Sequence, residues 1–273
     1  MAASTGEGRP AASTGGSLRR LARWAASRTR RGRIGGSDRA DLCIVSGCDH
    51  LRFNSFVNHR LFAEVNEVDY IFDLTLTPKG EGGYFNKLRA VRDRLRRYEA
   101  VFWIDDDAYF TDFAWRLRPY FAAHPAPMVI CKSPINEGAW TWISSGQFLL
   151  RRCDRAFEIL DRALAVDPAQ VRAWWDETAF GLYTNGDQDA LVHVLATERN
   201  LRNACKRLEY TAFNARPFHY ASELSEHRLV HFSSGSVDKR LGMTAFAARL
   251  NVNSFLVPDD LLSTVRVERY AAL

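Results

Sequence analysis

Apolar residues along the chain fall into two kinds of segment. Short continuous runs are typical of buried strands, and apolar residues repeated at helical spacing are typical of amphipathic helices. In the first part of the chain, strands and helices predicted in this way alternate over residues 42–46, 53–65, 68–76, 84–98 and 100–104. This βαβαβ order predicts a parallel sheet that is covered by helices on both faces.

The later part of the chain predicts further elements of the same α/β type. Strands are expected at 128–131, 141–150 and 229–232, and helices at 153–166, 168–175, 187–198 and 237–250. We expect the strand at 141–150 to make the sheet mixed. A glycine-rich loop is predicted at 79–83. No stretch of the sequence is long and apolar enough to span a bilayer.

The first residues do not follow this pattern. Residues 1–38 are rich in Ala, Ser, Gly and Arg and poor in large apolar side chains. Such a composition cannot bury enough surface to fold, so we predict a disordered basic tail at 1–38 and a single domain at 39–273. The apolar residues of 18–31 recur at helical spacing among arginines, which favours a basic amphipathic helix on an anionic membrane. A solubilising linker and an organellar transit peptide are the alternatives.

Length and charge limit the classes of function. With 273 residues, 47% hydrophobic and 12% aromatic, the chain can bury a substantial core. Its formal net charge of +5 is uneven, because residues 1–40 hold nine arginines against Glu7 and Asp38, a net of +7. Residues 41–273 therefore carry a net charge of −2. The folded part has no basic excess with which to hold a polyphosphate backbone, and we predict no nucleic-acid partner.

The number and spacing of the cysteines bear on the cellular compartment in which the protein is expected to fold. The chain has five of them, scattered without CxxC spacing. Their odd number and their scatter argue against a closed disulfide framework and against a zinc site. The N-terminal segment also lacks the apolar region of a secretory signal. We therefore predict a cytoplasmic protein, at most peripheral at the inner face of the membrane.

The most specific chemical feature is the triplet Asp105-Asp106-Asp107, which directly follows the apolar run at 100–104. Carboxylates at alternate positions suit Mg²⁺ or Mn²⁺, ions that are shared with the phosphates of a substrate. In open α/β sheets, ligands gather at the carboxyl ends of strands, where this triplet lies. A solvated acidic turn is the alternative, since charged runs usually face water. The apolar strand before the triplet favours a metal-dependent enzyme.

Four segments in a fixed order resemble a known family. They are Asn86-Lys87, Trp103-Ile104-Asp105-Asp106-Asp107-Ala108, Gly186-Asp187-Gln188-Asp189-Ala190-Leu191 and Val230-His231-Phe232. Together they resemble the retaining GT-A glycosyltransferases, in particular the family of α-galactosyl-, xylosyl- and mannosyltransferases, and glycogenin-like enzymes share the arrangement. The likeness extends from about residue 42 to about residue 239. It implies a Rossmann-like, α/β nucleotide-diphospho-sugar transferase fold with a mixed central sheet flanked by helices.

The resemblance implies a metal site. Asp105 and Asp107 correspond to the DxD pair, in which Asp107 binds the metal directly and Asp105 binds the metal or the donor ribose. His231 is similar to the histidine that completes the coordination sphere, and an imidazole is acceptable to Mn²⁺. Without the resemblance, a histidine beside apolar neighbours is more simply a core residue. The implied cofactor is Mn²⁺, with Mg²⁺ as the alternative.

The resemblance also implies contacts to the donor. Asp106 fills the variable position of the DxD segment, and Lys87 is implied to touch the donor diphosphate or sugar, with an exposed helix charge as its alternative. Gly146 stands where relatives place a small residue against the donor sugar, and a packing glycine is the alternative. Lys239 follows His231 where relatives carry a phosphate-binding lysine, although the family's flanking sequence is not reproduced here.

Catalysis is implied at the segment Asp187-Gln188-Asp189. Asp187 and Gln188 resemble a pair that approaches the donor sugar and the acceptor, where they would stabilise an oxocarbenium-like state or one of them would act as a nucleophile. The alternative for Asp187 is a helix N-cap. Asp189 is implied to contact the sugar or, equally, to interact with the first turn of the helix.

The implied activity is a metal-dependent, retaining glycosyl transfer from a nucleotide diphosphate sugar, with UDP-sugars ahead of GDP-mannose. The acceptor is a glycan, lipid-linked or small-molecule hydroxyl, and its choice is expected to reside in residues 133–141 and 163–186. Two other classes of function use the same carboxylates. One is a metal-dependent nucleotidyltransferase or phosphohydrolase. The other is a binding module that keeps the fold without catalysis.

Overall fold

The computed structural model describes residues 40–48, 51–74, 83–136, 138–233 and 238–264. The predicted basic tail at 1–38, its helix at 18–31 and most of the predicted loop at 79–83 lie outside the described residues. Their structure and their contact with a membrane therefore stay predictions. Within the described part of the chain, no helix is long and apolar enough to cross a membrane.

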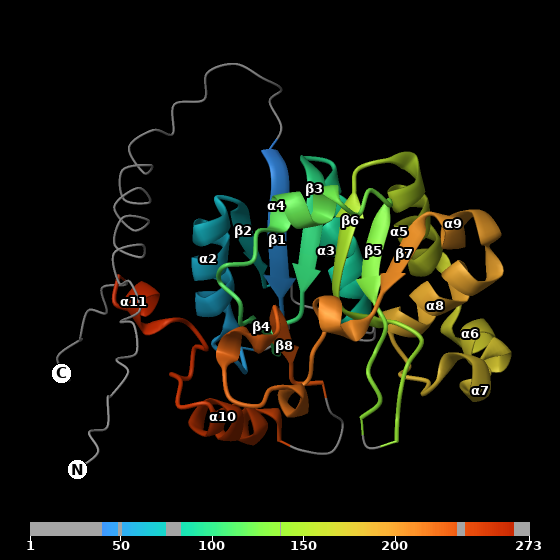
Figure 1. The fold of residues 1–273 in the computed structure, drawn as a ribbon. Helices are drawn as coiled ribbons and strands as arrows, with labels where there is room; N and C mark the ends of the chain where they lie inside the picture. Colours follow the sequence, from blue (N-terminus) through green and yellow to red (C-terminus); the bar gives the residue numbers. More distant parts are fainter. Residues whose placement is uncertain (1–39, 49–50, 75–82, 137, 234–237, 265–273) are drawn as a thin grey trace, which may run out of the picture. The chain divides into compact units, whose positions relative to one another are not determined.

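A six-stranded mixed sheet forms the centre of the described fold, with the order β2, β1, β3, β6, β5, β7 (Figure 1). The bounds are β1 (Ala40–Gly47), β2 (Asp69–Asp73), β3 (Tyr98–Ile104), β5 (Met128–Cys131), β6 (Ser144–Arg151) and β7 (Cys205–Leu208). β1 pairs in parallel with β2 and β3, and β7 pairs in parallel with β5. β6 runs antiparallel to both β3 and β5. The predicted parallel βαβαβ unit and the predicted mixed sheet are both confirmed.

Helices cover both faces of this sheet. They are α2 (Ser55–Asn66), α3 (Asn86–Leu95), α4 (Leu117–Ala122), α5 (Asp154–Ala165), α6 (Pro168–Trp174), α7 (Glu177–Phe180), α8 (Asp187–Thr197), α9 (Arg199–Asn203), α10 (Lys239–Arg249) and α11 (Asp259–Leu262), with 3₁₀ turns at Gly83–Phe85, Tyr210–Ala212, Pro217–His219 and Leu224–Glu226. Successive residues of β3 face opposite sides of the sheet. Val101 and Trp103 pack in a core with α3, α5 and α8, whereas Phe102 and Ile104 pack in a core with α2 and α4. The central sheet is therefore buried on both faces.

A small antiparallel ribbon lies beyond the carboxyl end of β3. It consists of β4 (Ala108–Phe110) and β8 (Leu229–His231), and Ala108 is paired with His231. The side chain of Asn58 on α2 holds β4, because its amide accepts a hydrogen bond from the Phe110 nitrogen at 2.8 Å and donates one to the Phe110 carbonyl at 2.9 Å. This ribbon joins the acidic triplet to the last segment of the family resemblance.

Several elements were not expected from the sequence pattern. β4 is only three residues long and follows the acidic triplet, so it is too short to show a period. β7 has the sequence Cys-Lys-Arg-Leu, whose two cations hide its strand character at the edge of the sheet. The short helices α4, α7, α9 and α11 span few turns and carry little periodic signal. These elements add to the predicted framework and leave the pairing of the predicted strands unchanged.

Candidate active site

Two clefts meet at the acidic triplet. The first, about 410 Å³, is lined by Cys48, which follows β1, by Asp73 at the end of β2, and by all three carboxylates of the triplet. The second, about 600 Å³, is lined by residues between Ser133 and Thr141, by the start of β6 and by the start of α8. The residues that line both clefts are Tyr84, Lys87, Asp105, Asp107 and Lys239. This arrangement allows two molecules to meet at the carboxylates.

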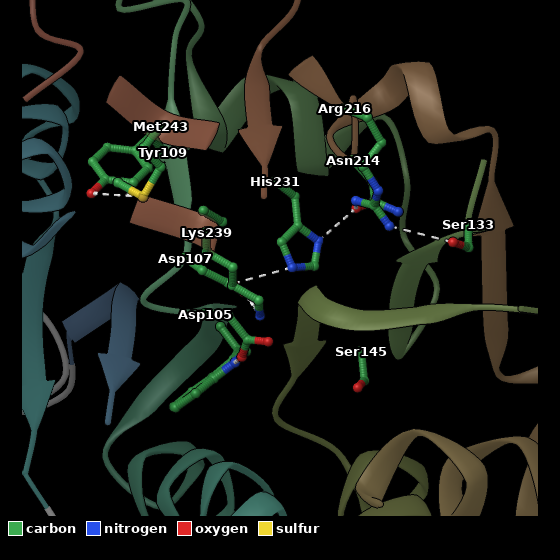
Figure 2. Close-up of polar contacts among 12 residues, drawn as sticks. Asp105, Asp107, Tyr109, Ser133, Ser145, Asn214, Arg216, His231, Lys239 and Met243 are labelled. Atoms are coloured by element: carbon green, nitrogen blue, oxygen red, sulfur yellow. Dashed lines mark hydrogen bonds and ion pairs between the residues drawn. The ribbon is translucent and has the colours of Figure 1, made fainter. Parts of the chain in front are cut away.

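Asp105, Asp107 and His231 converge, each offering one ligand atom, and these atoms lie within 4.8 Å of one another (Figure 2). Asp105 follows β3, and its backbone nitrogen donates to the Gly146 carbonyl at 2.8 Å. Asp107 precedes β4, and its carbonyl accepts from the Phe232 nitrogen at 2.9 Å. The backbone pairing of the sheet and the ribbon therefore brings the predicted metal ligands together.

The carboxylate of Asp107 lies between two nitrogens. His231 Nε2 lies 3.2 Å from one of its oxygens, and Lys239 Nζ lies 2.6 Å from the other. Burial alone would raise the pKa of Asp107, but His231 and Lys239 outweigh this effect and hold that pKa well below its usual range. Asp107 is therefore ionised at neutral pH, as a metal ligand must be.

The donor set fits a hard divalent cation. His231 is only 5% exposed, and burial lowers its pKa, which favours the neutral imidazole that a metal ligand needs, while the Asp107 carboxylate opposes this shift. Among the described residues, the buried Oδ1 atom of Asp107 accepts no well-aligned hydrogen bond, although His231 Nε2 lies 3.2 Å from it. A buried carboxylate oxygen without a donor is costly unless a positive charge reaches it. Two carboxylates and one neutral imidazole are ligands that Mn²⁺ and Mg²⁺ sites use.

Lys87 links the triplet to the start of α8. Its Nζ lies 3.0 Å from Asp105 Oδ1 and 3.5 Å from Asp187 Oδ2, and its side chain is 11% exposed. Burial opposes the charge of Lys87, but Asp105 and Asp187 overcome this and raise its pKa. The alternative prediction of an exposed helix charge is wrong, because Lys87 lies on the first turn of α3 where that helix faces the two clefts.

The remaining carboxylates of the triplet differ in their surroundings. Trp103 Nε1 donates to Asp105 Oδ1 at 2.7 Å, which fixes that side chain. Asp106 lines only the first cleft of the two. Burial and the charges of Asp107 and Asp105 raise the pKa of Asp106 to about 7. The position of Asp106 is compatible with its predicted donor contact, which stays a prediction.

The start of α8 corrects one expectation. Asp187 is not the N-cap, because Gly186 holds that position and Asp187 is the first helical residue. The capping bonds come from Asp189, which accepts from the Thr184 nitrogen at 2.9 Å and from the Gly186 nitrogen at 3.2 Å. Asp189 thus makes the first-turn interaction that was one of its two predicted roles. Its contact with a sugar stays a prediction.

Asp187 itself points to the second cleft and is 3% exposed. Burial raises its pKa to about 6, Lys87 opposes this rise, and Asp105 adds to it. The neighbouring Gln188 accepts a hydrogen bond from the Ser145 nitrogen at 3.1 Å. Both predicted catalytic side chains therefore lie at the wall that β6 and α8 share.

Gly146 provides room for the metal ligand. A Cβ atom at this position would lie 2.4 Å from His231 Cε1, which is closer than any real contact allows. The glycine is therefore required for the imidazole to rest against β6. It also lines the second cleft, so its predicted contact with the donor sugar stays a prediction.

The sequence pattern did not reveal two residues behind the histidine. Asn214 is fully buried and Arg216 is 3% exposed, and they connect His231 to Ser133 at the edge of the second cleft. They alternate with the buried Phe213 and Ala215. An apolar-polar alternation usually indicates a strand with one solvated face, so nothing in the pattern marked these polar residues as buried.

Sequence comparisons find relatives among plant glycosyltransferases. The chain is 28% identical over 197 residues to "Probable glycosyltransferase 6" of Oryza sativa subsp. japonica, covering 68% of this chain and 41% of that protein. It is 26% identical over 164 residues to "Probable xyloglucan 6-xylosyltransferase 1" of Oryza sativa subsp. indica, covering 55% and 36%. The chain thus spans less than half the length of these relatives. No protein-family model matches it. The sequence resemblance to glycosyltransferases is confirmed.

A comparison of structures supports the fold. The chain matches the crystal structure of a glycosyltransferase involved in the glycosylation of the major capsid of PBCV-1, with a TM-score of 0.54 and 10% identity. The match covers 76% of this chain and 99% of that one. The predicted α/β GT-A fold, with a mixed central sheet flanked by helices, is therefore confirmed.

Proposed function

We propose that this protein is a metal-dependent, retaining glycosyltransferase that moves a sugar from a nucleotide diphosphate sugar to a hydroxyl group. The observation that carries the proposal is the convergence of Asp105, Asp107 and His231 where the two clefts meet, in a chain with this fold and these relatives. A nucleotide sugar needs two neighbouring subsites, one for the nucleotide and one for the sugar beside its acceptor.

Asp105, Asp107 and His231 would hold the cation, with Mn²⁺ ahead of Mg²⁺ because an imidazole is among the ligands. When bound, the cation would neutralise the negative charge that develops on the leaving diphosphate. Lys239 lies against Asp107 with 36% of its side chain exposed, so its ammonium can turn to a phosphate without leaving the site. No protonated acid is then needed at the leaving group.

The first cleft is proposed for the nucleotide and the second for the sugar and its acceptor. The first extends from the triplet toward the carboxyl ends of β1 and β2, where open α/β sheets bind ligands. The second includes Trp140 and Thr141, from a segment predicted to select the acceptor. UDP-sugars are the preferred donors, and a glycan, lipid-linked or small-molecule hydroxyl is the acceptor. Cytoplasmic location, at most peripheral at the membrane, belongs to this proposal.

Asp187 and Gln188 are proposed to act on the sugar. Asp187 is a buried carboxylate on the wall of the second cleft, and with a pKa of about 6 it is mostly ionised at pH 7. A carboxylate there would stabilise the positive charge of an oxocarbenium-like state. Lys87 holds Asp187 and Asp105 in place through its two ion pairs. The sugar transfer is therefore proposed to take place in the second cleft, beside Asp187 and Gln188, while the nucleotide occupies the first cleft.

The direct test is a panel of UDP- and GDP-sugars incubated with purified protein and Mn²⁺, with nucleoside diphosphate release as the readout. We expect release from one donor, and we expect EDTA or Asp107→Asn to abolish it. Asp161→Asn is the matched control, because Asp161 lies on α5 as the exposed ion-pair partner of Arg92. Release of pyrophosphate would instead indicate a nucleotidyltransferase. Binding without consumption of any donor would indicate a binding module.

A further inference from the structure

A buried chain of side chains lies behind the metal-binding face of His231 (Figure 2). His231 Nδ1 lies 3.1 Å from Asn214 Oδ1, and Arg216 Nη1 donates to the same oxygen at 2.8 Å. Arg216 Nη2 continues the chain to Ser133 Oγ at 3.3 Å. The backbone supports this arrangement, because the His231 nitrogen donates to the Ala215 carbonyl at 2.8 Å.

The orientation of the Asn214 amide is fixed from two sides. Its nitrogen donates to the Lys132 carbonyl at 3.0 Å, and a carbonyl can only accept. Its oxygen accepts from the guanidinium of Arg216, which can only donate. Turning the amide over would place two donors together on one side and two acceptors together on the other. The oxygen of Asn214 therefore faces the imidazole.

An acceptor at Nδ1 determines where the imidazole carries its proton. Nδ1 of His231 must be the protonated nitrogen if it is to bond to Asn214 Oδ1. In a neutral ring, Nε2 then carries a lone pair, and Nε2 is the atom that lies 3.2 Å from Asp107 Oδ1. Two lone pairs that face each other in a buried place are costly unless a positive charge lies between them, and either a metal ion or a second proton on the ring supplies that charge. The same pattern, a ligand histidine bonded through its other nitrogen, orients histidines in many metal sites.

We propose that Asn214, held by Arg216 and the Lys132 carbonyl, is a positioning residue that fixes the Nδ1–H tautomer of His231 and so presents Nε2 as a metal ligand. Asn214 itself lines neither cleft, and among its contacts with the described residues the imidazole of His231 is the one candidate metal ligand. The inference rests on the proposed function only for the role of the metal, because the tautomer and the binding of Mn²⁺ can be measured without any sugar donor.

A matched pair of variants separates positioning from simple support. Asn214→Leu has nearly the same shape but offers no acceptor, whereas Asn214→Asp keeps an acceptor for both His231 and Arg216. Both variants lose the hydrogen bond to the Lys132 carbonyl, and Asn214→Leu also loses the acceptor for Arg216, so the free energy of unfolding is measured for each variant beside its Mn²⁺ affinity. We expect Mn²⁺ affinity, measured by electron paramagnetic resonance, to fall about 10–100-fold in Asn214→Leu and to stay near that of the wild type in Asn214→Asp.

The tautomer is read independently from long-range proton–nitrogen spectra of protein labelled with ¹⁵N-histidine, with His231→Gln to assign the signal. We expect protonated Nδ1 in the metal-free wild type and in Asn214→Asp. His59 supplies the opposite reference, because its Nε2 lies 2.7 Å from the Ala108 carbonyl and must carry the proton. Protonated Nε2 at His231, equal Mn²⁺ affinity in both variants, or no Mn²⁺ binding by the wild type would overturn the inference. Tight Mn²⁺ binding without sugar transfer would overturn only the proposed function.

Discussion

Two buried pairs of asparagine and histidine lie at the ribbon of β4 and β8, and they differ in the groups to which they are hydrogen-bonded. Asn58 and His59 on α2 direct their hydrogen bonds to backbone atoms, those of Phe110 and Ala108 among them. Asn214 and His231 bond to each other and reach a carboxylate and a guanidinium. The first pair completes a fold, and the second converges on a cleft.

The two histidines show why burial alone does not identify a functional residue. Both are at most 5% exposed, and in both burial lowers the pKa. His59 has a backbone carbonyl at Nε2, so its protonated nitrogen is committed to the fold. His231 has its partner at Nδ1, which leaves Nε2 toward Asp107. The nature of the partner, more than the depth of burial, separates structure from chemistry.

The largest effect on Mn²⁺ binding and turnover should come from Asp107, the carboxylate beside His231 of the second pair. Asp107→Asn removes the charge that faces both His231 and Lys239 while keeping the shape of the side chain. We expect Mn²⁺ binding to be lost and nucleoside diphosphate release to fall by about 10³-fold or more. Electron paramagnetic resonance and the release assay measure the two quantities. Turnover at the wild-type rate in this variant would exclude the metal site.

The structural pair should respond in the opposite way. Asn58→Leu leaves the backbone nitrogen and carbonyl of Phe110 and the carbonyls of Phe255 and Leu256 without their partner. We expect the free energy of unfolding to fall by roughly 3–5 kcal/mol, measured by urea denaturation. Mn²⁺ affinity of the folded protein should stay within about threefold of the wild type. A loss as large as that of Asn214→Leu would break the distinction between the two pairs.

The free energy of unfolding should fall at acid pH because His59 is buried in its neutral form. The pKa of His59 is about 4 in the folded protein because burial disfavours the charged ring, against 6.5 for an ordinary histidine. Between these values the unfolded chain binds a proton that the folded chain does not, so stability falls as the pH drops from 6.5 to 4. We expect the wild type to lose about 3 kcal/mol more than His59→Gln over this window. Parallel pH dependences of the two unfolding free energies would contradict this.

A smaller effect should come from the glycine that seats the imidazole. Gly146→Ala places a Cβ against His231 Cε1, and we expect a loss of about 1–3 kcal/mol of stability together with about tenfold weaker Mn²⁺ binding. Gly242→Ala on α10 is the matched control, because a Cβ there meets nothing within 4 Å. That control should gain up to about 1 kcal/mol, since alanine favours a helix. Unfolding and Mn²⁺ titrations of both variants sharpen the comparison by showing whether space around His231 matters.

The framework of the fold was predictable because its elements carry strong periodic signals. Continuous apolar runs marked β1 and β3, and the charged face of α3 marked a helix between β2 and β3. The framework then fixed the place of Asp105 and Asp107, since ligands gather where parallel strands end. In each of these segments the local sequence pattern alone was enough to predict where the residues lie in the fold.

The residues around the site were harder to predict from the sequence, because their positions depend on contacts between distant segments. Nothing local distinguishes Asn214 and Arg216 from polar residues on a solvated strand, and their burial follows from packing beside β8. The alternative role of Asp187 as an N-cap is wrong, because Gly186 holds the N-cap position and Asp189 accepts the capping hydrogen bonds. The boundaries of helices predicted from sequence are uncertain by one or two residues, so the sequence does not settle which residue caps the helix.

The pairing of β4 with β8 has a consequence for how the protein matures. Asp107 comes from the middle of the chain and His231 from near its end, and only the ribbon brings them together. A growing chain that has already formed its parallel strands would still lack the last ligand. High-affinity metal uptake would thus report that the C-terminal segment has docked, and bound metal would in turn hold it there by mass action. The ion would thus stabilise the contact between β4 and β8 only after both strands have folded.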